Sequence, residues 1–273
     1  MARSPVRRHP IAACLQMCSG ADVEVNIGVV ETLVARAVAM GACFVATPEN
    51  TTLLATPAAK LAAAETLDGP LHRRLGEIAR RHGVWLLVGS VAERIDDRRC
   101  YNTSLLFDAD GNLQAFYRKI HLFDVDVPGA RFQESAVVQP GGDLTVCDTP
   151  IGRLGMSVCY DVRFPELYRG LSTLGATVIS VPSAFTVPTG KDHWHLLVRA
   201  RAVETQSWIL APAQEGAHGN GRHSFGHTLI VDPWGRIAAE CAEAEGVAVA
   251  EIDLDRVAAI RSGMPISAHR RLV

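Results

Sequence analysis

The chain has 273 residues, of which 48% are hydrophobic, and its 27 basic and 29 acidic residues give a formal net charge of -2. This length and composition allow a large buried core without metals or disulfides. The balance of charge argues against a nucleic-acid partner, since such proteins usually carry a basic excess on one face. No apolar run reaches the roughly 18 residues that a membrane span requires, so we expect no membrane partner.

The start of the chain has two possible interpretations, a leader segment or a first buried strand. Residues 1–8 are basic and residues 11–15 are apolar, which faintly resembles a signal peptide, but the apolar run is short and polar Gln16 follows it. We interpret residues 11–17 as a first buried strand. Seven cysteines without regular spacing favour a reducing, cytoplasmic location over a disulfide framework.

Predicted helices and strands then alternate. The hydrophobic pattern predicts a helix at 26–40 ending at Gly41, a strand at 43–46 stopped by Pro48, a helix at 71–82 closed by Gly83, and a buried strand at 84–89. A hairpin of 101–107 and 113–117 turns at Asp110-Gly111. The composition of 125–143, rich in Pro, Gly and polar residues, predicts a loop.

The second half continues the alternation. It contains predicted strands at 151–158, 177–181, 208–212, 228–231 and 247–252, and predicted helices at 165–174 and 193–206. No linker or repeat interrupts this order, so we expect a single α/β domain over residues 1–273. The hairpin among the strands predicts mixed rather than purely parallel sheets.

Cys159 is the first candidate for chemistry. A predicted apolar strand ends at this residue and a helix begins near Pro165, so the side chain is expected in the crevice where α/β proteins bind ligands. Backbone N–H groups at such a turn can donate to an oxyanion. Free cysteine is usually buried and inert, so its position alone is weak evidence. The surrounding Gly155-Met156-Ser157-Val158-Cys159 half-resembles a serine-hydrolase elbow but has Cys in place of the last Gly.

Three charged residues occupy comparable positions. Glu49 follows the strand at 43–46 and can act as a general base, although a lone Glu there is more often solvated. Lys119 ends the hairpin strand, where a cation can stabilise an oxyanion or simply face solvent. Glu134 lies in the predicted loop and would by itself be judged exposed.

Jointly, these four positions resemble the nitrilase (carbon–nitrogen hydrolase) superfamily, which carries a Glu–Lys–Cys triad and a second Glu in the loop after the Lys. Order, flanking residues and spacings match at Glu49, Lys119, Glu134 and Cys159. The likeness extends through most of the chain, including residues 118–129, 182–185, 193–194, 199–204, 226–227 and 232–235. Tyr160-Asp161 follows the cysteine, where nitrile-hydrolysing members have Trp and carbamoyl hydrolases have Asn-Asp. This resembles the ω-amidase and deaminated-glutathione amidase branch.

The resemblance implies a fold and an activity. The expected fold is an α-β-β-α four-layer sandwich with mixed sheets, associating into homodimers or higher even oligomers, with a C-terminal tail at about 262–273 near the interface. The expected reaction is hydrolysis of a carboxylate-bearing primary amide to acid and ammonia through a thioester, the substrate being deaminated glutathione or an ω-amide of a 2-oxo acid. Such a small-molecule amidase needs no cofactor.

The resemblance also implies a role for each matching residue. Glu49 is the base and Cys159 the nucleophile, Lys119 and the Tyr160 N–H hold the oxyanion, and Glu134 holds Lys119 or the substrate nitrogen. The residues expected to bind the substrate or the oxyanion are Tyr160, Asp161, Arg163, Ser183 and Phe185. An alternative interpretation makes Asp161, Arg163 and Glu166 supports of the Cys loop.

Other readings stay open. An N-carbamoyl hydrolase would use the same residues and also release carbon dioxide, and a retired enzyme would serve as a scaffold. His193 and His195 are two apart on a predicted helix and face different ways, so we expect no metal site there. His218, Arg222 and His223 lie in a Gly-rich segment that is either a solvated loop or a lid over the substrate.

Overall fold

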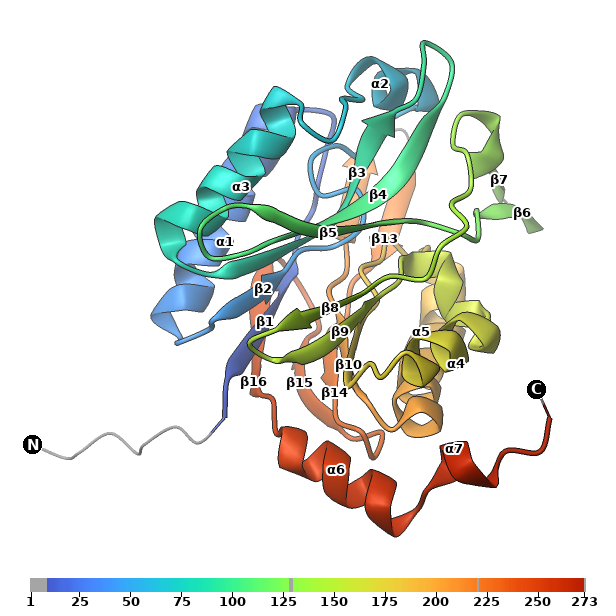
Figure 1. The fold of residues 1–273 in the computed structure, drawn as a ribbon. Coiled ribbons are helices and arrows are strands. Elements are labelled where there is room, and N and C mark those ends of the chain that lie inside the picture. Colours follow the sequence, from blue (N-terminus) through green and yellow to red (C-terminus); the bar gives the residue numbers. More distant parts are fainter. Residues whose placement is uncertain (1–8, 128–129, 220, 273) are drawn as a thin grey trace, which may run out of the picture.

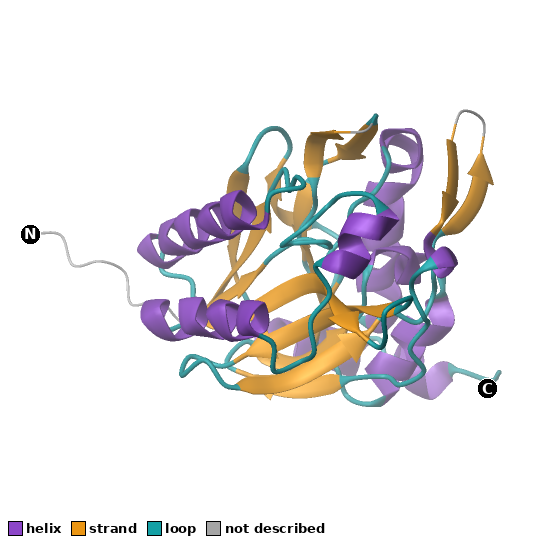
Figure 2. Ribbon diagram, turned by 90° about the horizontal axis from the view of Figure 1, so that it is seen from above, coloured by secondary structure: helices purple, strands orange, loops and turns teal. Residues whose placement is uncertain are grey.

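Two six-stranded sheets lie face to face in the computed structural model, and helices cover their outer faces (Figure 1 and Figure 2). The structure describes residues 9–127, 130–219 and 221–272. This arrangement confirms the predicted four-layer α-β-β-α sandwich, and both sheets contain parallel and antiparallel pairs, as expected for mixed sheets.

The first sheet has the strand order β16-β1-β2-β3-β4-β5. Its strands are β16 (Gly246–Glu251), β1 (Ile11–Gln16), β2 (Phe44–Ala46), β3 (Trp85–Arg94), β4 (Cys100–Phe107) and β5 (Leu113–Arg118). The helices α1 (Val23–Ala39) and α3 (Pro70–His82) pack on its outer face. The three central strands β1, β2 and β3 run parallel, and the others pair antiparallel.

The second sheet has the strand order β15-β14-β11-β10-β9-β8. Its strands are β15 (Ile237–Cys241), β14 (Thr228–Val231), β11 (Trp208–Ala211), β10 (Val178–Ser180), β9 (Gly152–Met156) and β8 (Val146–Thr149). The helices α4 (Pro165–Thr173) and α5 (Val187–Thr205) cover it.

Shorter elements complete the chain. They are α2 (Pro57–Ala62), the hairpin β6 (Asp124–Val127) and β7 (Ala130–Gln133), the 3-10 turns η1 (Glu134–Ala136) and η2 (Cys159–Arg163), the hairpin β12 (Glu215–Gly219) and β13 (Arg222–Phe225), α6 (Leu254–Gly263) and α7 (Ile266–His269).

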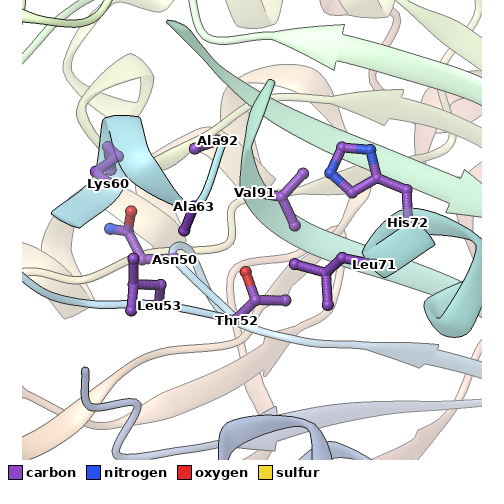
Figure 3. A pocket seen from close by; sticks show the side chains of 9 residues that line it. All are labelled: Asn50, Thr52, Leu53, Lys60, Ala63, Leu71, His72, Val91 and Ala92. Carbon is purple, nitrogen blue, oxygen red and sulfur yellow. The ribbon is translucent and has the colours of Figure 1, made fainter. Parts of the chain in front are cut away.

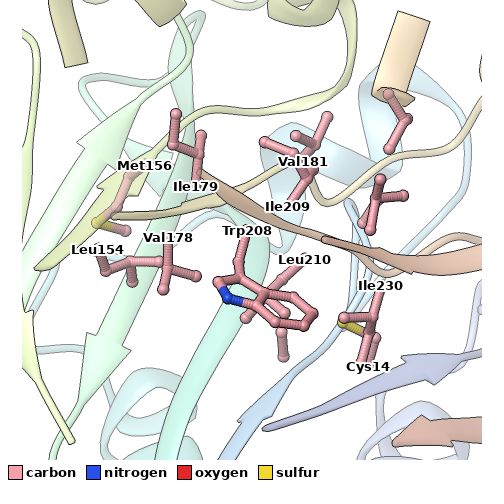
Figure 4. Packing of buried hydrophobic residues seen from close by; sticks show 14 of the residues in the cluster. Cys14, Leu154, Met156, Val178, Ile179, Val181, Trp208, Ile209, Leu210 and Ile230 are labelled. Carbon is pink, nitrogen blue, oxygen red and sulfur yellow. The ribbon is translucent and has the colours of Figure 1, made fainter. Parts of the chain in front are cut away.

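Strand β1 shows why its sequence reads as a continuous apolar run. Ala12 and Cys14 face the second sheet, whereas Ile11, Ala13 and Leu15 face α1 and α3. Successive side chains of a strand point to opposite sides, so a strand buried on both faces needs apolar residues at every position. Figure 4 shows the inner cluster, in which Cys14 lies among side chains of the second sheet.

Capping residues set the ends of the helices on the first sheet. The Asp22 side chain accepts hydrogen bonds from the N–H groups of Glu24 and Val25, so α1 begins three residues before the predicted start at 26. Helix α3 ends as predicted at Gly83, which has a left-handed φ of 61° that side chains with a Cβ disfavour.

Three predictions of local structure were wrong. Residues 125–143 are not one loop, because β6 and β7 pair antiparallel there and η1 follows them. Helix α5 begins at Val187 rather than at 193, with Pro188 in the first turn, where its missing N–H costs nothing. The Gly-rich segment around His218 forms the β12–β13 hairpin.

Two further observations concern the environment of the chain. Within the described ranges, none of the helices combines the length and the apolar character of a membrane-spanning segment. All seven cysteines are free thiols.

Candidate active site

The site lies at one end of the sandwich, where strands of the two sheets end side by side. Glu49 follows β2 of the first sheet, Lys119 directly follows β5, and Cys159 begins η2 just after β9 of the second sheet. Residues at the carboxyl ends of strands point into the crevice beyond the sheet. The fold thus brings together three residues that lie 40 or more positions apart in the sequence.

Lys119 is the centre of the charged cluster. Its Nζ donates to Glu49 Oε1 and to Glu134 Oε2, each at 2.9 Å. Only 1% of the Lys119 side chain is exposed, against 5% for Glu49 and 14% for Glu134. A buried ammonium is tolerated here because two carboxylates compensate its charge. Glu134, expected to be exposed when judged alone, is therefore part of the site.

Asn102 is a member of this cluster that the sequence analysis missed. Its Nδ2 donates to Glu49 Oε1 at 3.0 Å and to Glu134 Oε1 at 2.9 Å. Asn102 lies on β4, and its own backbone carbonyl accepts the N–H of Lys119 at 2.9 Å. A polar Asn within a predicted strand was the available signal, since Asn is depleted in strands.

Backbone groups fix the two carboxylates. Glu49 Oε2 accepts the N–H of Ala184 at 3.0 Å, and Glu134 Oε2 accepts the N–H of Phe123 at 2.8 Å. Both oxygens of each carboxylate therefore have a protein donor. These donors hold each carboxylate in one orientation, and fixed orientation is a requirement for efficient catalysis.

Burial and neighbouring charges together determine the protonation states of Lys119 and Glu134. Burial alone would raise the pKa of Glu134, but the ammonium groups of Lys119 and Lys60 outweigh it and lower this pKa to about 2. Burial alone would lower the pKa of Lys119, but Glu134 and Glu49 hold it well above its ordinary value. Lys119 is therefore a cation and Glu134 an anion at neutral pH.

The surroundings of Cys159 favour the neutral thiol over the thiolate. Burial raises its pKa well above the ordinary value, and the charge of Glu49 raises it further, whereas Lys119 acts in the opposite direction. The Cys159 side chain is therefore a neutral thiol at pH 7. Such a thiol can act as a nucleophile only if a base removes its proton, because only the thiolate is nucleophilic.

The backbone at Cys159 is strained. Its φ of 50° is unusual for a residue with a side chain, and such outliers gather at functional sites. The Cys159 N–H donates to the carbonyl of Pro182 at 2.9 Å. The Asp161 carboxylate stabilises the turn by accepting hydrogen bonds from the Val158 N–H at 2.9 Å and from the Tyr117 hydroxyl at 2.8 Å.

Gly89 allows the segments that carry the site to approach one another. A Cβ on Gly89 of β3 would collide with the backbone oxygens of Thr47 and Pro48 and with the side chain of Pro182. The loop that leads to Glu49 therefore lies directly against the loop of Pro182, whose carbonyl accepts the Cys159 N–H. A side chain at position 89 would force these two loops, and with them Glu49 and Cys159, apart.

A cavity of about 750 Å³ opens in front of these residues. This volume is within the usual range of small-molecule sites. Glu49, Lys119, Glu134 and Cys159 all line it. The remaining walls contain aromatic side chains and an excess of cations, namely Phe123, Phe132, Tyr160, Phe185, Lys60, Arg131, Arg163 and Arg222.

A second cavity lies nearby, next to Lys60 and His72 (Figure 3). Its volume of about 10 Å³ accommodates no more than one water molecule. Burial lowers the pKa of His72, so this ring is neutral at pH 7. The larger cavity is thus the one of the two with room for a substrate.

The expected substrate-binding residues divide into two groups. Tyr160, Arg163 and Phe185 line the large cavity. Asp161 and Ser183 are fully buried and are not among its lining residues. Ser183 Oγ instead donates to the carbonyl of Val181 at 3.0 Å. Both side chains therefore lie behind the surface of the cavity, in contact with the loops that form it.

The β12–β13 hairpin forms another wall. His218, Arg222 and His223 all line the cavity. His218 is mostly buried, and its Nδ1 donates to the carbonyl of Ser19 at 2.8 Å. The reading of this segment as a merely solvated loop is therefore wrong for His218.

Known proteins are similar to this chain in fold and in sequence. A family model described as carbon-nitrogen hydrolase matches residues 11–262. A deaminated glutathione amidase of Yersinia enterocolitica is 46% identical over 96% of this chain and 93% of its own length. The crystal structure of the C. elegans NitFhit protein superposes with a TM-score of 0.90 at 39% identity, covering 96% of this chain and 65% of that chain.

A third comparison concerns the nucleophile. An amidase from Nesterenkonia sp. AN1 matches with a TM-score of 0.79 and 27% identity, covering 95% of this chain and 100% of that one. Its structure, determined on a Glu-to-Gln mutant, shows the product of Michael addition of acrylamide at the active-site cysteine. Since the family model spans nearly all of the sandwich and the Yersinia relative matches along almost the whole sequence, this protein belongs to the carbon–nitrogen hydrolase family.

Proposed function

We propose that this carbon–nitrogen hydrolase is a cysteine-dependent amidase that cleaves deaminated glutathione through a thioester on Cys159. The observation that carries the proposal is the position of the buried Glu49–Lys119–Glu134 cluster beside Cys159, at a cavity lined by cations. The deaminated glutathione amidase of Yersinia enterocolitica, 46% identical, supports the choice of substrate.

Acylation begins with the neutral Cys159 thiol. Glu49 takes the thiol proton as Sγ attacks the amide carbon, and the carbonyl electrons move to oxygen. The C–N bond then breaks, the proton on Glu49 passes to the departing nitrogen, and a thioester remains on Cys159. Water loses a proton to Glu49, attacks the thioester and releases the acid, and the proton returns to the thiolate.

Two donors are placed for the oxyanion. Lys119 is held as a cation between Glu49 and Glu134, and its third ammonium proton, which has no acceptor among the described residues, can be donated to a ligand. Tyr160 is the second residue of η2, and the first N–H groups of a helix have no partner within it. Each such donor is typically worth about 10²–10³ in rate.

The cations of the cavity support a substrate with more than one carboxylate. Among the described residues, no salt bridge involves Lys60, Arg131, Arg163 or Arg222. Arg163 lies over the rings of Tyr160 and Phe185 at 5.7 and 5.3 Å. Arg222 lies on a different wall, 5.8 Å from the centre of the Phe132 ring. Guanidinium groups bind carboxylates through paired hydrogen bonds.

With deaminated glutathione as the substrate, the expected leaving group is an amine and not ammonia. Deaminated glutathione has two carboxylates and only secondary amides, so its cleavage releases an amine, cysteinylglycine, together with a 2-oxo diacid. Ammonia would be released only from the corresponding ω-amide. Both compounds have the same acyl group, and their products distinguish them.

The first experiment compares these two compounds and an N-carbamoyl amino acid. We expect release of the 2-oxo diacid from deaminated glutathione at a higher kcat/KM than from the ω-amide, and no release by Cys159→Ala. A preference for the ω-amide would reassign the substrate. Carbon dioxide and ammonia from the carbamoyl compound would establish that activity instead. No product from any compound, with Cys159 unlabelled by iodoacetamide, would favour the scaffold reading.

The two arginines provide a finer test. Arg163 follows the nucleophile by four residues, so we assign it to the carboxylate of the acyl group, and we assign Arg222 to the carboxylate of the leaving group. Arg163→Gln should raise KM for both compounds, whereas Arg222→Gln should raise KM about 10- to 100-fold for deaminated glutathione alone. Equal effects of Arg222→Gln on both compounds would contradict the assignment.

We also propose that the domain functions as a homodimer in the cytoplasm. Leu196 and Val203 are seven residues apart on α5, and both side chains are exposed, Leu196 by 67%. Seven residues are two helical turns, so they share one face that a second copy can cover. Leu196→Glu should shift the protein to monomers in light scattering coupled to size exclusion, whereas Lys191→Glu should not. The free cysteines are consistent with a reducing compartment.

A further inference from the structure

A cluster of metal-binding side chains lies outside the catalytic cavity. His195 comes from the middle of α5, His227 from the turn before β14, and Glu240 from β15. The Glu240 Oε1 atom lies 3.1 Å from His195 Nε2 and 2.7 Å from His227 Nδ1. One ligand atom from each residue falls within 4.8 Å of the other two, and all three side chains are partly exposed.

We propose that His195, His227 and Glu240 form a binding site for a divalent transition metal ion, for which Zn²⁺ is the expected occupant. Two imidazoles and one carboxylate are a common zinc ligand set, completed by water. With metal–ligand bonds of about 2.0–2.2 Å, tetrahedral ligand atoms lie about 3.3–3.5 Å apart. The observed separations of 2.7 and 3.1 Å are slightly shorter than this, so Glu240 would move outward on binding, and the two imidazoles would adjust from a separation within 4.8 Å.

The surrounding structure holds the ligands in place. The carbonyl of His227 accepts the Trp194 Nε1–H at 2.7 Å, and its ring stacks on Phe225 with centroids 4.4 Å apart. His227 also has a φ of 58°, a conformation that residues with a side chain rarely adopt. A metal site is precise only where packing and hydrogen bonds hold its ligands, and these contacts do so for His227 although it lies in a turn.

The helix position of the histidines explains why the sequence analysis did not identify this site. His193 and His195 do face different partners, as expected, and His193 lies 3.3 Å from an Arg163 nitrogen instead. The other two ligands come from residues 32 and 45 positions further along the chain. Only the packing of α5 against the second sheet brings the three together.

A bound ion would connect this cluster to the catalytic cavity. The β12–β13 hairpin, which supplies His218 and Arg222 to the cavity wall, ends at Phe225 against His227. Linking α5 to β15 through His227 would fix the base of this hairpin. The role assigned to the ion is therefore structural, and it does not depend on the proposed substrate.

The same contacts also satisfy an ordinary hydrogen-bonded cluster without a metal. Partial burial alone would raise the pKa of Glu240, but hydrogen bonds from His227 and His195 outweigh it and lower that pKa. Zinc would compete with the protons of the two rings, because ligating nitrogens must be unprotonated. The two readings therefore differ in metal content, which can be measured directly.

The test uses the full chain without a histidine tag. After equilibrium dialysis against Zn²⁺, elemental analysis should find one zinc ion per wild-type chain and an elevated Tm. His195→Ala and Glu240→Gln should lose both the bound zinc and the rise in Tm. His193→Ala, a matched change two residues away on the same helix, should keep the zinc.

Free thiols could bind zinc in place of this cluster, so Co²⁺ is used as a spectroscopic probe. An absorption spectrum without a thiolate charge-transfer band supports imidazole and carboxylate ligands. A thiolate band that persists in His195→Ala would overturn the proposal. So would wild-type protein that takes up no zinc, or equal zinc content in His195→Ala and wild type.

Discussion

Lys119 Nζ and Glu49 Oε1 lie 2.9 Å apart, and at least 95% of each side chain is buried. The pair joins the end of β5 to the end of β2 within the first sheet. Such a pair adds little net stability by comparison with apolar residues, but leaving one partner uncompensated is costly. We therefore expect the pair to serve catalysis more than stability.

Replacing the cation should test this view. Lys119→Met leaves Glu49 and Glu134 buried side by side without a counter-ion, and it removes an oxyanion donor. We expect kcat to fall at least about 10²–10³-fold and the free energy of unfolding to fall by about 3–5 kcal/mol. Urea unfolding and steady-state kinetics measure both quantities.

Lys191→Met is the matched control for this change. Lys191 is an exposed residue of α5 with no salt bridge to any described residue. Its unfolding free energy should stay within about 0.5 kcal/mol of wild type. A Lys119→Met protein with near-normal stability would show that the two carboxylates become protonated or find other partners.

Removing the base should separate thiol reactivity from turnover. Burial is the main cause of the raised pKa of Cys159, and Glu49 adds to it while Lys119 opposes it. In Glu49→Gln the pKa of the thiol should fall, so Cys159 should react with iodoacetamide at lower pH than in wild type. Amide turnover should fall about 10²–10⁴-fold, because no group transfers the proton.

Peptide mass spectrometry must follow Cys159 itself in this experiment, since six other cysteines can react. Cys14 provides an internal reference, because it is fully buried and its pKa is raised by burial. If the labelling of Cys159 slows in parallel with turnover, Glu49 is not what keeps the thiol neutral.

Asn102 should act as a positioning residue. Its amide donates to both Glu49 and Glu134, so Asn102→Leu leaves an oxygen of each carboxylate without this donor. A hydrogen bond to a charged group is worth about 1.5–3 kcal/mol, which corresponds to a roughly 10- to 100-fold loss in kcat. Because Asn102 is not among the residues that line the cavity, KM should change little.

Ser104→Ala is the control for Asn102. Ser104 lies on the same strand and its Oγ donates to the carbonyl of Val88 at 3.1 Å, away from the carboxylates. This variant should keep its kcat. A large rise in KM for Asn102→Leu without a loss in kcat would assign Asn102 to substrate binding instead.

The low pKa of Glu134 predicts a dependence of stability on pH. Burial opposes ionisation, but Lys119 and Lys60 lower the pKa to about 2 in the folded protein, against about 4.5 unfolded. The folded state binds fewer protons than the unfolded state between these values. The stabilisation is therefore complete above about pH 4.5 and is lost as the pH falls towards 2.

Glu134→Gln should remove this contribution. The difference in unfolding free energy between wild type and Glu134→Gln should be larger at pH 6 than at pH 3, as measured by urea denaturation at each pH. Glu166→Gln, a change at an exposed residue of α4, should show no such difference. A wild-type advantage that is the same at both values would contradict the charge pairing.

Much of the order of elements was determined by the sequence. Runs such as residues 11–16 are apolar at every position because both faces of β1 are covered, and Gly83 ends α3 where a left-handed residue is required. These are local properties, so they can be recognised without tertiary contacts. The family resemblance supplied the four-layer arrangement and the four charged or nucleophilic residues that line the cavity.

The tertiary structure decided which side chains meet. Asn102 contacts Glu49 and Glu134 because β4 lies between β3 and β5 in the sheet that also contains β2, and nothing in its local sequence specifies those partners. The hairpins β6–β7 and β12–β13 form where the composition indicates loops. Their strand pairing depends on tertiary contacts in the walls of the cavity. His195, His227 and Glu240 meet only when α5 packs on the second sheet. Contacts between distant segments depend on the whole fold, whereas helix ends and strand faces depend on neighbouring residues alone.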